Sequence, residues 1–248
     1  MNDIGEIYMS LYEDKALEEL LQWKKEMTSR PSFTNDFTKK MQSKLNEFIP
    51  EKCQHIITKS IESMVKTVIY GYKYISTAPV HDMNLESREN LVREKMKFYR
   101  NAAAVSGAGT GGAGIIVGLA DFPILLGLKM KFLFDTAGIY SFNVKNYRER
   151  LYILYIFQIA FSSQGRRREV YDIMSDWDNY CRASLPEDKS HFDWRTFQQE
   201  YRDYIDIAKM LQLVPGIGAA VGAYANYKLI KQLGNTAMNA YRLRVFKL

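Results

Sequence analysis

The sequence contains few of the residues that build metal sites and disulfide frameworks. Among 248 residues there are two cysteines, Cys53 and Cys181, and three histidines, His55, His81 and His191. None of them stands at the C-x-x-C, H-x-x-x-H or H-x-E spacing of a metal site. The two cysteines lie far apart in amphipathic helical patterns, so we expect reduced thiols in the core of a cytoplasmic protein. Neither a metal nor a cofactor is expected.

Motifs for nucleotide binding and hydrolysis are also missing. The chain has no G-x-x-x-x-G-K-[ST] phosphate loop and no G-x-S-x-G nucleophile elbow. Gly107, Gly109 and Gly112 do match G-x-G-x-x-G, but the preceding MKFYRNAAAV has a helical pattern where a dinucleotide fold needs a buried strand. The sequence therefore indicates no catalytic residue, and an enzyme is the less favoured class.

No stretch alternates apolar and polar residues for long enough to predict a strand, and the opening residues contain acids where a secretion signal needs a basic start. We predict an all-α protein with one multi-helix domain over residues 1–248. Amphipathic helices occupy 1–75, and a glycine-rich core with its surrounding helices occupies 85–248. The segment STAPVHDMN between them contains an aspartate and an asparagine that can cap the next helix.

Apolar residues recur at three- and four-residue spacing in nine segments. This spacing predicts helices over about 3–29, 33–48, 50–75, 85–120, 123–140, 147–162, 171–183, 194–213 and 215–246. The apolar and aromatic segment 147–162 is too short for a comfortable membrane span, so we expect it to be a central core helix. The GRRR sequence after it is expected to form a turn.

Glycine is concentrated between residues 101 and 128, where Asp121 is the only charged residue. On a helix, one face would carry Gly107, Gly111, Gly114, Gly118 and Asp121. Glycine costs about 1 kcal/mol relative to alanine inside a helix, so we expect another helix to approach this face closely. The glycines dilute the apolar run, which favours a buried or peripherally embedded helix over a transmembrane hairpin.

A second uncharged segment, 210–227, can supply the neighbouring helix. It begins near Pro215 and Gly216, and one helical face carries Gly218, Gly222 and Asn226. Small residues at four-residue spacing allow two helices to pack at short distance. We therefore predict that the two glycine ridges pair at the centre of the fold.

Asp121 precedes Pro123, where a new helix should begin. One interpretation is that Asp121 caps this helix and pairs with Asn226 or a tyrosine hydroxyl, because a buried carboxylate needs such partners. The alternative is that Asp121 binds a ligand or a proton in an internal helical pocket. In that case the protein would be a small-ligand or lipid-binding protein, or a hydrolase.

The chain has a net charge of +6, and many of its basic residues stand beside the glycine-rich segments. They are Arg93, Lys95, Lys97, Arg100, Lys129 and Lys131 around the first, and Lys228, Lys231, Arg242, Arg244 and Lys247 after the second. This distribution favours a cytoplasmic membrane face over nucleic acid. Arg166, Arg167 and Arg168 either form a solvated turn or contact an anionic surface.

Three motifs resemble the EcsC family: IPEKCQHIIT near residue 50, SGAGTGGAG leading to LADFP, and VPGIGAAVGAYANY. The matching positions are Asp121, Pro123, Pro215, Gly216, Gly218, Gly222 and Asn226. The resemblance implies an all-helical bacterial protein of a family named after a gene that accompanies those of the Ecs ABC transporter. It implies no molecular activity and no role for any of these residues.

With the basic flanks, the resemblance points to a cytoplasmic accessory protein, peripheral at the inner face of the cell membrane. The expected partners are ABC transporter components and an anionic membrane surface, and not nucleic acid.

Overall fold

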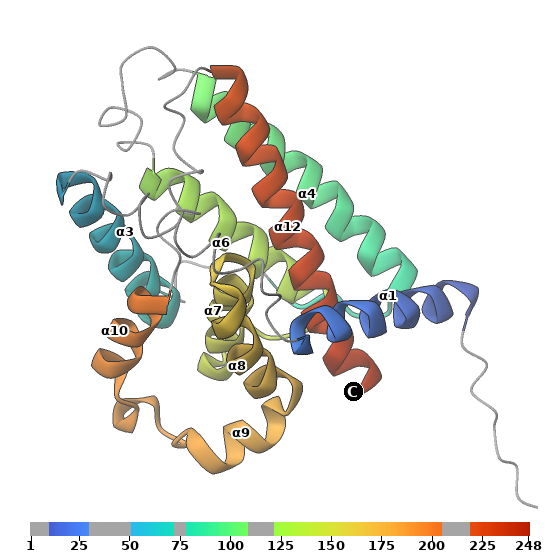
Figure 1. Cartoon of the computed structure of the whole chain (residues 1–248). Helices are drawn as coiled ribbons and strands as arrows, with labels where there is room; N and C mark the ends of the chain where they lie inside the picture. The colour runs from blue at the N-terminus through green and yellow to red at the C-terminus, as the bar shows by residue number, and fades with distance from the viewer. Residues whose placement is uncertain (1–9, 30–50, 72–77, 109–121, 205–218) are drawn as a thin grey trace, which may run out of the picture.

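The computed structural model describes residues 10–29, 51–71, 78–108, 122–204 and 219–248 (Figure 1). Within these ranges the regular structure is helical and contains no β-strand, which confirms the all-α prediction. The helices are α1 (Leu11–Thr28), α3 (Glu51–Tyr70), α4 (Leu85–Ala108), α6 (Phe122–Ile139), α7 (Tyr147–Phe161), α8 (Gln164–Ser175), α9 (Trp177–Ser184), α10 (Trp194–Tyr204) and α12 (Ala219–Phe246), with a 3₁₀ turn at Lys189–His191.

Helix α7 lies at the centre of the fold. Every side chain from Glu149 to Phe161 is buried, and α3, α6, α8 and α12 all contact this helix. A helix that is apolar on all sides needs neighbours on all sides. The predicted core helix is therefore confirmed, and one hydrophobic core joins the described helices into a single domain.

Helices α4 and α12 lie side by side and make the most extensive contact between any two described helices (Figure 1). They contain Gly107 and Gly222, so parts of both predicted ridges belong to neighbouring helices. The closest glycine contact described between them is at Gly234, where an added Cβ would lie 2.7 Å from the Met96 Cε. Pairing of the ridge glycines themselves stays a prediction.

Local capping determines where several helices begin. At the start of α1, the Glu13 N–H donates to the Ser10 hydroxyl and the Ser10 N–H donates to the Glu13 carboxylate, at 3.2 and 2.8 Å. Asn84 accepts from the Ser87 N–H at 2.9 Å, which confirms the predicted asparagine cap of α4. Pro123 stands in the first turn of α6, where its missing N–H costs little.

Three local predictions are wrong. Residues 165–168 form the first turn of α8 and not a loop, and the predicted helix over 171–183 is divided between α8 and α9 at Asp176. The apolar residues of the amphipathic helix predicted over 3–29 should face the core, but two of them, Leu11 and Leu21, are 90% and 50% exposed. The buried side chains are Ala16, Leu20 and Trp23, because α1 contacts the rest of the fold along one narrow stripe.

Candidate functional site

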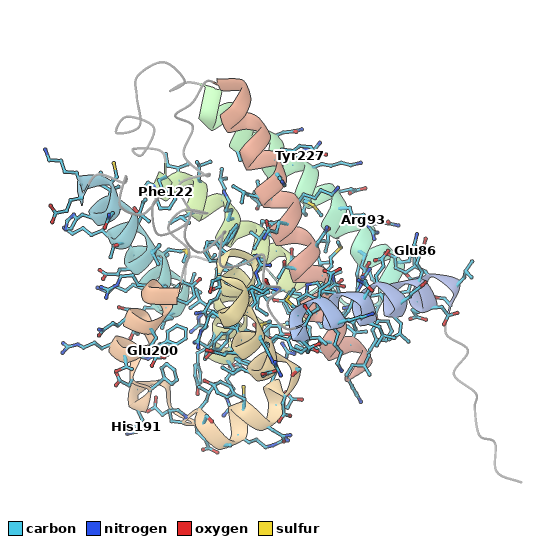
Figure 2. The ribbon with its side chains drawn as sticks, in the orientation of Figure 1. Glu86, Arg93, Phe122, His191, Glu200 and Tyr227 are labelled. Carbon is cyan, nitrogen blue, oxygen red and sulfur yellow. The ribbon has the colours of Figure 1, made fainter. Side chains whose placement is uncertain are left out.

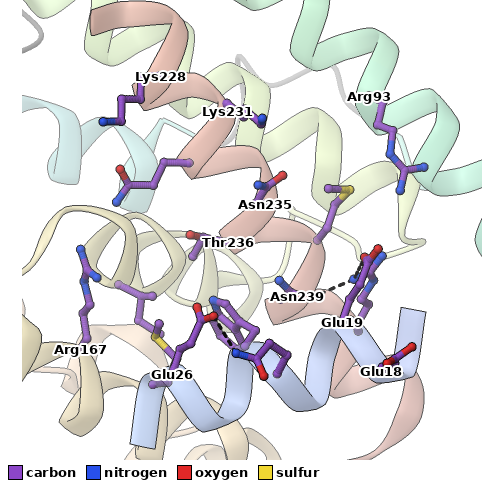
Figure 3. A pocket seen from close by; sticks show the side chains of 17 residues that line it. Glu18, Glu19, Glu26, Arg93, Arg167, Lys228, Lys231, Asn235, Thr236 and Asn239 are labelled. Atoms are coloured by element: carbon purple, nitrogen blue, oxygen red, sulfur yellow. Dashed lines mark hydrogen bonds and ion pairs between the residues drawn. The ribbon is translucent and has the colours of Figure 1, made fainter. Parts of the chain in front are cut away.

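A groove of about 890 Å³ separates α1 from α12 (Figure 3). The α1 wall carries the carboxylates of Glu18, Glu19 and Glu26. Apolar side chains of the same helix, such as Trp23 and Met27, also line the groove. The opposite side carries basic side chains: Arg93, Arg167, Lys228, Lys231 and Arg242. The groove is therefore charged with opposite signs on its two walls.

The basic wall follows from the spacing of residues on α12. Lys228, Lys231, Asn235 and Asn239 are separated by three, four and four residues, which places them on one helical face. Lys228 and Lys231 are exposed. Arg167, on α8, also lines the groove and donates from Nε to the Ser162 carbonyl at 3.2 Å. Lys228 and Lys231 form no ion pair with any residue that the structure describes, so their ammonium groups can bind an anionic ligand in the groove.

At the inner end of the groove, Arg242 and Glu89 form a buried bidentate ion pair. The Arg242 Nε and Nη2 donate to the two Glu89 carboxylate oxygens, both at 2.6 Å, and the residues are 2% and 0% exposed. The Tyr12 and Tyr140 hydroxyls also donate to Glu89, at 2.6 and 3.0 Å. Arg242 Nη1 reaches the Glu19 carboxylate at 2.9 Å. One network therefore joins α1, α4, α12 and the residue after α6.

The environment keeps both members of this pair ionised. Burial alone would raise the pKa of Glu89, but hydrogen bonds from Arg242 and Tyr12 outweigh it and lower the pKa. Burial likewise lowers the pKa of Arg242, and the Glu89 carboxylate raises it by more. A fully coordinated carboxylate with a depressed pKa is a poor general base. The pair therefore positions helices and does not transfer protons near neutral pH.

Two further arginines, one buried and one half-buried, hold helices in place. Arg150 is 1% exposed and donates from Nε and Nη2 to the Ile69 carbonyl at 3.2 and 3.0 Å, which satisfies an acceptor in the last turn of α3. Arg244 pairs with Glu149 across α12 and α7, and its Cζ lies 3.8 Å from the centroid of the Phe142 ring. These side chains are structural, because each is occupied by protein partners.

Exposed or half-exposed aromatic and basic side chains also lie on α4 and α12, away from the Glu89–Arg242 pair. Phe98 and Tyr227 are 64% and 42% exposed, and the Arg100 Cζ lies 4.6 Å from the centroid of the Tyr227 ring. Lys97, which precedes Phe98, and Lys228, which follows Tyr227, are also exposed. We call these five residues the basic–aromatic end. Figure 2 shows Tyr227 near one end of the α4–α12 pair and Glu86 near the opposite end.

The residues proposed from sequence fall into three groups. Asp121, Gly111, Gly114, Gly118, Pro215, Gly216 and Gly218 lie outside the described residues. Gly107, Gly222 and Asn226 lie in described helices, but their side-chain surroundings are outside the description, so their packing or polar role stays a prediction. Arg166, Arg167 and Arg168 are in the first turn of α8 and differ in environment: Arg166 pairs with Glu169, Arg167 lines the groove, and Arg168 is exposed.

Sequence reasoning missed the buried charges. Arg242, Arg244 and Lys129 were counted among basic flanks, but each is largely buried, and Lys129 is 1% exposed. The Lys129 Nζ makes no hydrogen bond among the residues that the structure describes, and burial lowers its pKa to about 7. Glu89 stands in the charged run ESRENLVREK, which by itself reads as a solvated helix face. Only the fold shows which of these charges turns inward.

Cys53 and Cys181 are buried, unpaired thiols, as predicted. Among the described residues, no helix combines the length and apolar character that a membrane span requires. Fold and site together thus define an all-helical protein with buried ion pairs, a charged groove and an exposed basic–aromatic end.

Comparison with known proteins identifies the family. Residues 14–246 match the EcsC protein family. The chain is 41% identical over 232 residues to Protein EcsC of Bacillus subtilis (strain 168), covering 93% of this chain and 95% of that protein. It is 26% identical over 215 residues to Uncharacterized protein YdbA of the same organism, covering 86% and 79%. No solved structure matches. The chain therefore belongs to the EcsC family.

Proposed function

We propose that this protein is a cytoplasmic accessory protein that binds the anionic inner surface of the cell membrane and acts with an ABC transporter, without catalytic activity of its own. The basic–aromatic end is the observation that carries the proposal. Membership of the EcsC family supports the link to a transporter, because the family is named after a gene that accompanies those of the Ecs ABC transporter.

The chemistry of the basic–aromatic end suits a lipid interface. Aromatic side chains are enriched at the level of the lipid headgroups, and Phe98 and Tyr227 are both exposed. Each lysine or arginine near an anionic surface contributes about 1 kcal/mol, so Lys97, Arg100 and Lys228 together contribute about 3 kcal/mol. Binding of this strength is reversible, as expected of a peripheral protein.

Vesicle flotation tests the proposal. The full chain should float with vesicles containing phosphatidylglycerol, and less with phosphatidylcholine alone or at high salt, because salt screens exposed charges. Changing Lys97, Arg100 and Lys228 together to glutamate should weaken binding by at least about 100-fold, since each cation contributes about 1 kcal/mol. Phe98→Ser should weaken binding at every salt concentration, because its contribution is apolar.

The matched control is on α1, where Leu21 and Lys25 are exposed on the side away from the groove. Leu21→Ser with Lys25→Glu should leave flotation unchanged. Equal binding to neutral and anionic vesicles, or equal loss in the α1 control, would refute the membrane-surface function. The transporter link is tested by copurification of transporter subunits from membranes, which should occur with the parent chain and decline in the glutamate variant.

The alternative of a ligand pocket around Asp121 concerns a residue outside the described part of the chain. It stays a prediction. Asp121→Asn retains the geometry of a helix cap but removes the charge. If this variant restores function in a strain that lacks the protein, the capping role is favoured.

A further inference from the structure

A second groove, lined by none of the residues of the first, runs between α3 and α6, which lie side by side in Figure 1. Its volume is about 410 Å³, which lies within the range of about 300–1,000 Å³ that is usual for small-ligand sites. The floor is formed by buried apolar side chains: Met64, Val68, Leu126, Met130 and Phe134. An apolar floor of this kind favours a hydrocarbon group.

The groove is elongated along α6. Its lining residues on this helix extend from Pro123 to Phe134 at three- and four-residue spacing, which corresponds to about 16 Å at 1.5 Å per residue. Met64 and Met130 are flexible thioethers that can adapt to a chain of varying shape. A trough with these dimensions accommodates one extended alkyl chain.

Gly127 keeps the trough open. It lies inside α6, where glycine is unfavourable by about 1 kcal/mol relative to alanine. A Cβ built at this position would meet no atom within 4 Å, so helix packing does not require a glycine here. The residue lines the groove and is exposed. A larger side chain at this position would therefore extend into the space of the groove.

The polar rim supplies one available cation. Lys59 on α3 is exposed and forms no ion pair with any residue that the structure describes, whereas Lys131 on α6 is bound to Asp135. The hydroxyls of Ser60 and Thr67 donate to carbonyls of their own helix, at 2.7 and 2.8 Å. A single apolar trough beside one available ammonium group matches one alkyl chain with one negative head group.

We propose that the groove between α3 and α6 binds a free long-chain fatty acid, with its alkyl chain along the trough and its carboxylate at the Lys59 ammonium. This site is independent of the basic–aromatic end, which belongs to α4 and α12. A two-chain membrane phospholipid would leave its second chain in water, because the groove accommodates one chain.

Fluorescence titration of the purified full chain with cis-parinaric acid tests the proposal, with palmitate as competitor. Saturable binding at one site per chain is expected. Gly127→Trp should weaken binding by at least about tenfold by filling the trough, and Gly127→Ala should retain it within about twofold. Gly165→Trp is the matched control, because a Cβ at Gly165 also meets no atom within 4 Å but lies on α8.

Charge is tested at Lys59. Lys59→Glu should weaken binding by about fivefold or more, whereas Lys59→Arg should retain it, and hexadecanol should compete less well than palmitate because it lacks the carboxylate. Circular dichroism melting monitors folding of each variant, and Gly127→Leu serves if the tryptophan variant is unfolded. Vesicle flotation of Gly127→Trp should be unchanged, which separates this site from the membrane contact.

Absence of saturable binding by the parent chain would overturn the proposal. So would equal affinity in the folded Gly127→Trp or Gly127→Leu variant, or an equal loss in Gly165→Trp. Equal competition by hexadecanol and palmitate would overturn the assignment of the carboxylate to Lys59.

Discussion

Removal of one member of the Glu89–Arg242 pair should strongly destabilise the fold. Glu89→Ala leaves the Arg242 guanidinium buried with Asn239 and the half-exposed Glu19 carboxylate. Arg242→Ala leaves the Glu89 carboxylate with two tyrosine hydroxyls and the more exposed Arg93. Breaking a buried pair in this way costs about 3–5 kcal/mol. This is a large part of the 5–15 kcal/mol that stabilises typical domains.

Thermal unfolding followed by circular dichroism measures this loss. For a chain of this size about 1 kcal/mol shifts the midpoint by 2–4 °C, so each single variant should melt about 6–20 °C below the parent. The double alanine variant should lose less than the sum of the single variants, because it leaves no unpaired buried charge. The control is the Arg166–Glu169 pair, in which the Glu169 side chain is 62% exposed. Glu169→Ala should cost no more than about 1 kcal/mol.

The same pair predicts a pH dependence with a definite sign. The pKa of Glu89 is lower in the folded protein than its ordinary value. Its contribution to stability is therefore present above the unfolded pKa of about 4.3 and is lost as the pH falls through the folded pKa. The stability difference between the parent and Glu89→Gln should shrink between pH 7 and strongly acidic pH. This account of the pair would be refuted if the single alanine variants melted within about 2 °C of the parent. It would also be refuted if the stability loss of the double alanine variant equalled the sum of the two single losses.

Three further predictions concern single residues. Gly234→Leu should lower the free energy of unfolding in urea by about 1–3 kcal/mol or more, because even its Cβ would stand 2.7 Å from the Met96 Cε. Gly234→Ala should cost less, because the end of the methionine side chain can rotate. Equal losses in the two variants would contradict this packing. Gly127→Ala should raise the free energy of unfolding by about 0.5–1 kcal/mol in the same measurement. A lower free energy of unfolding would show that the added methyl group meets other atoms. Burial lowers the pKa of Lys129 to about 7, so stability should rise between pH 7 and 9, where only the unfolded state keeps this proton. Lys129→Met should abolish that rise, and an unchanged pH profile would show that Lys129 is not its source.

The sequence by itself determined the helices and their approximate ends. Apolar periodicity located the described helices except α8 and α9, which it merged into one segment. The asparagine at position 84 marked the start of α4, and the proline at position 123 marked the start of α6. These features are local, because capping and helical spacing depend on residues within one or two turns. The central position of α7 was also predictable, since a helix that is apolar on all sides has no face for water.

Only the tertiary structure decided which charges are buried and where the grooves lie. Glu89 and Arg242 are 153 residues apart. Glu89 stands in a charged run, and Arg242 stands beside Arg244 and Lys247, so each reads as solvated when its sequence neighbours are taken alone. The first groove needs α1 beside α12, and the second needs α3 beside α6. Local spacing specifies a helical face but not the helix that covers it. The partner of a buried charge, or the opposite wall of a groove, is therefore set by long-range packing.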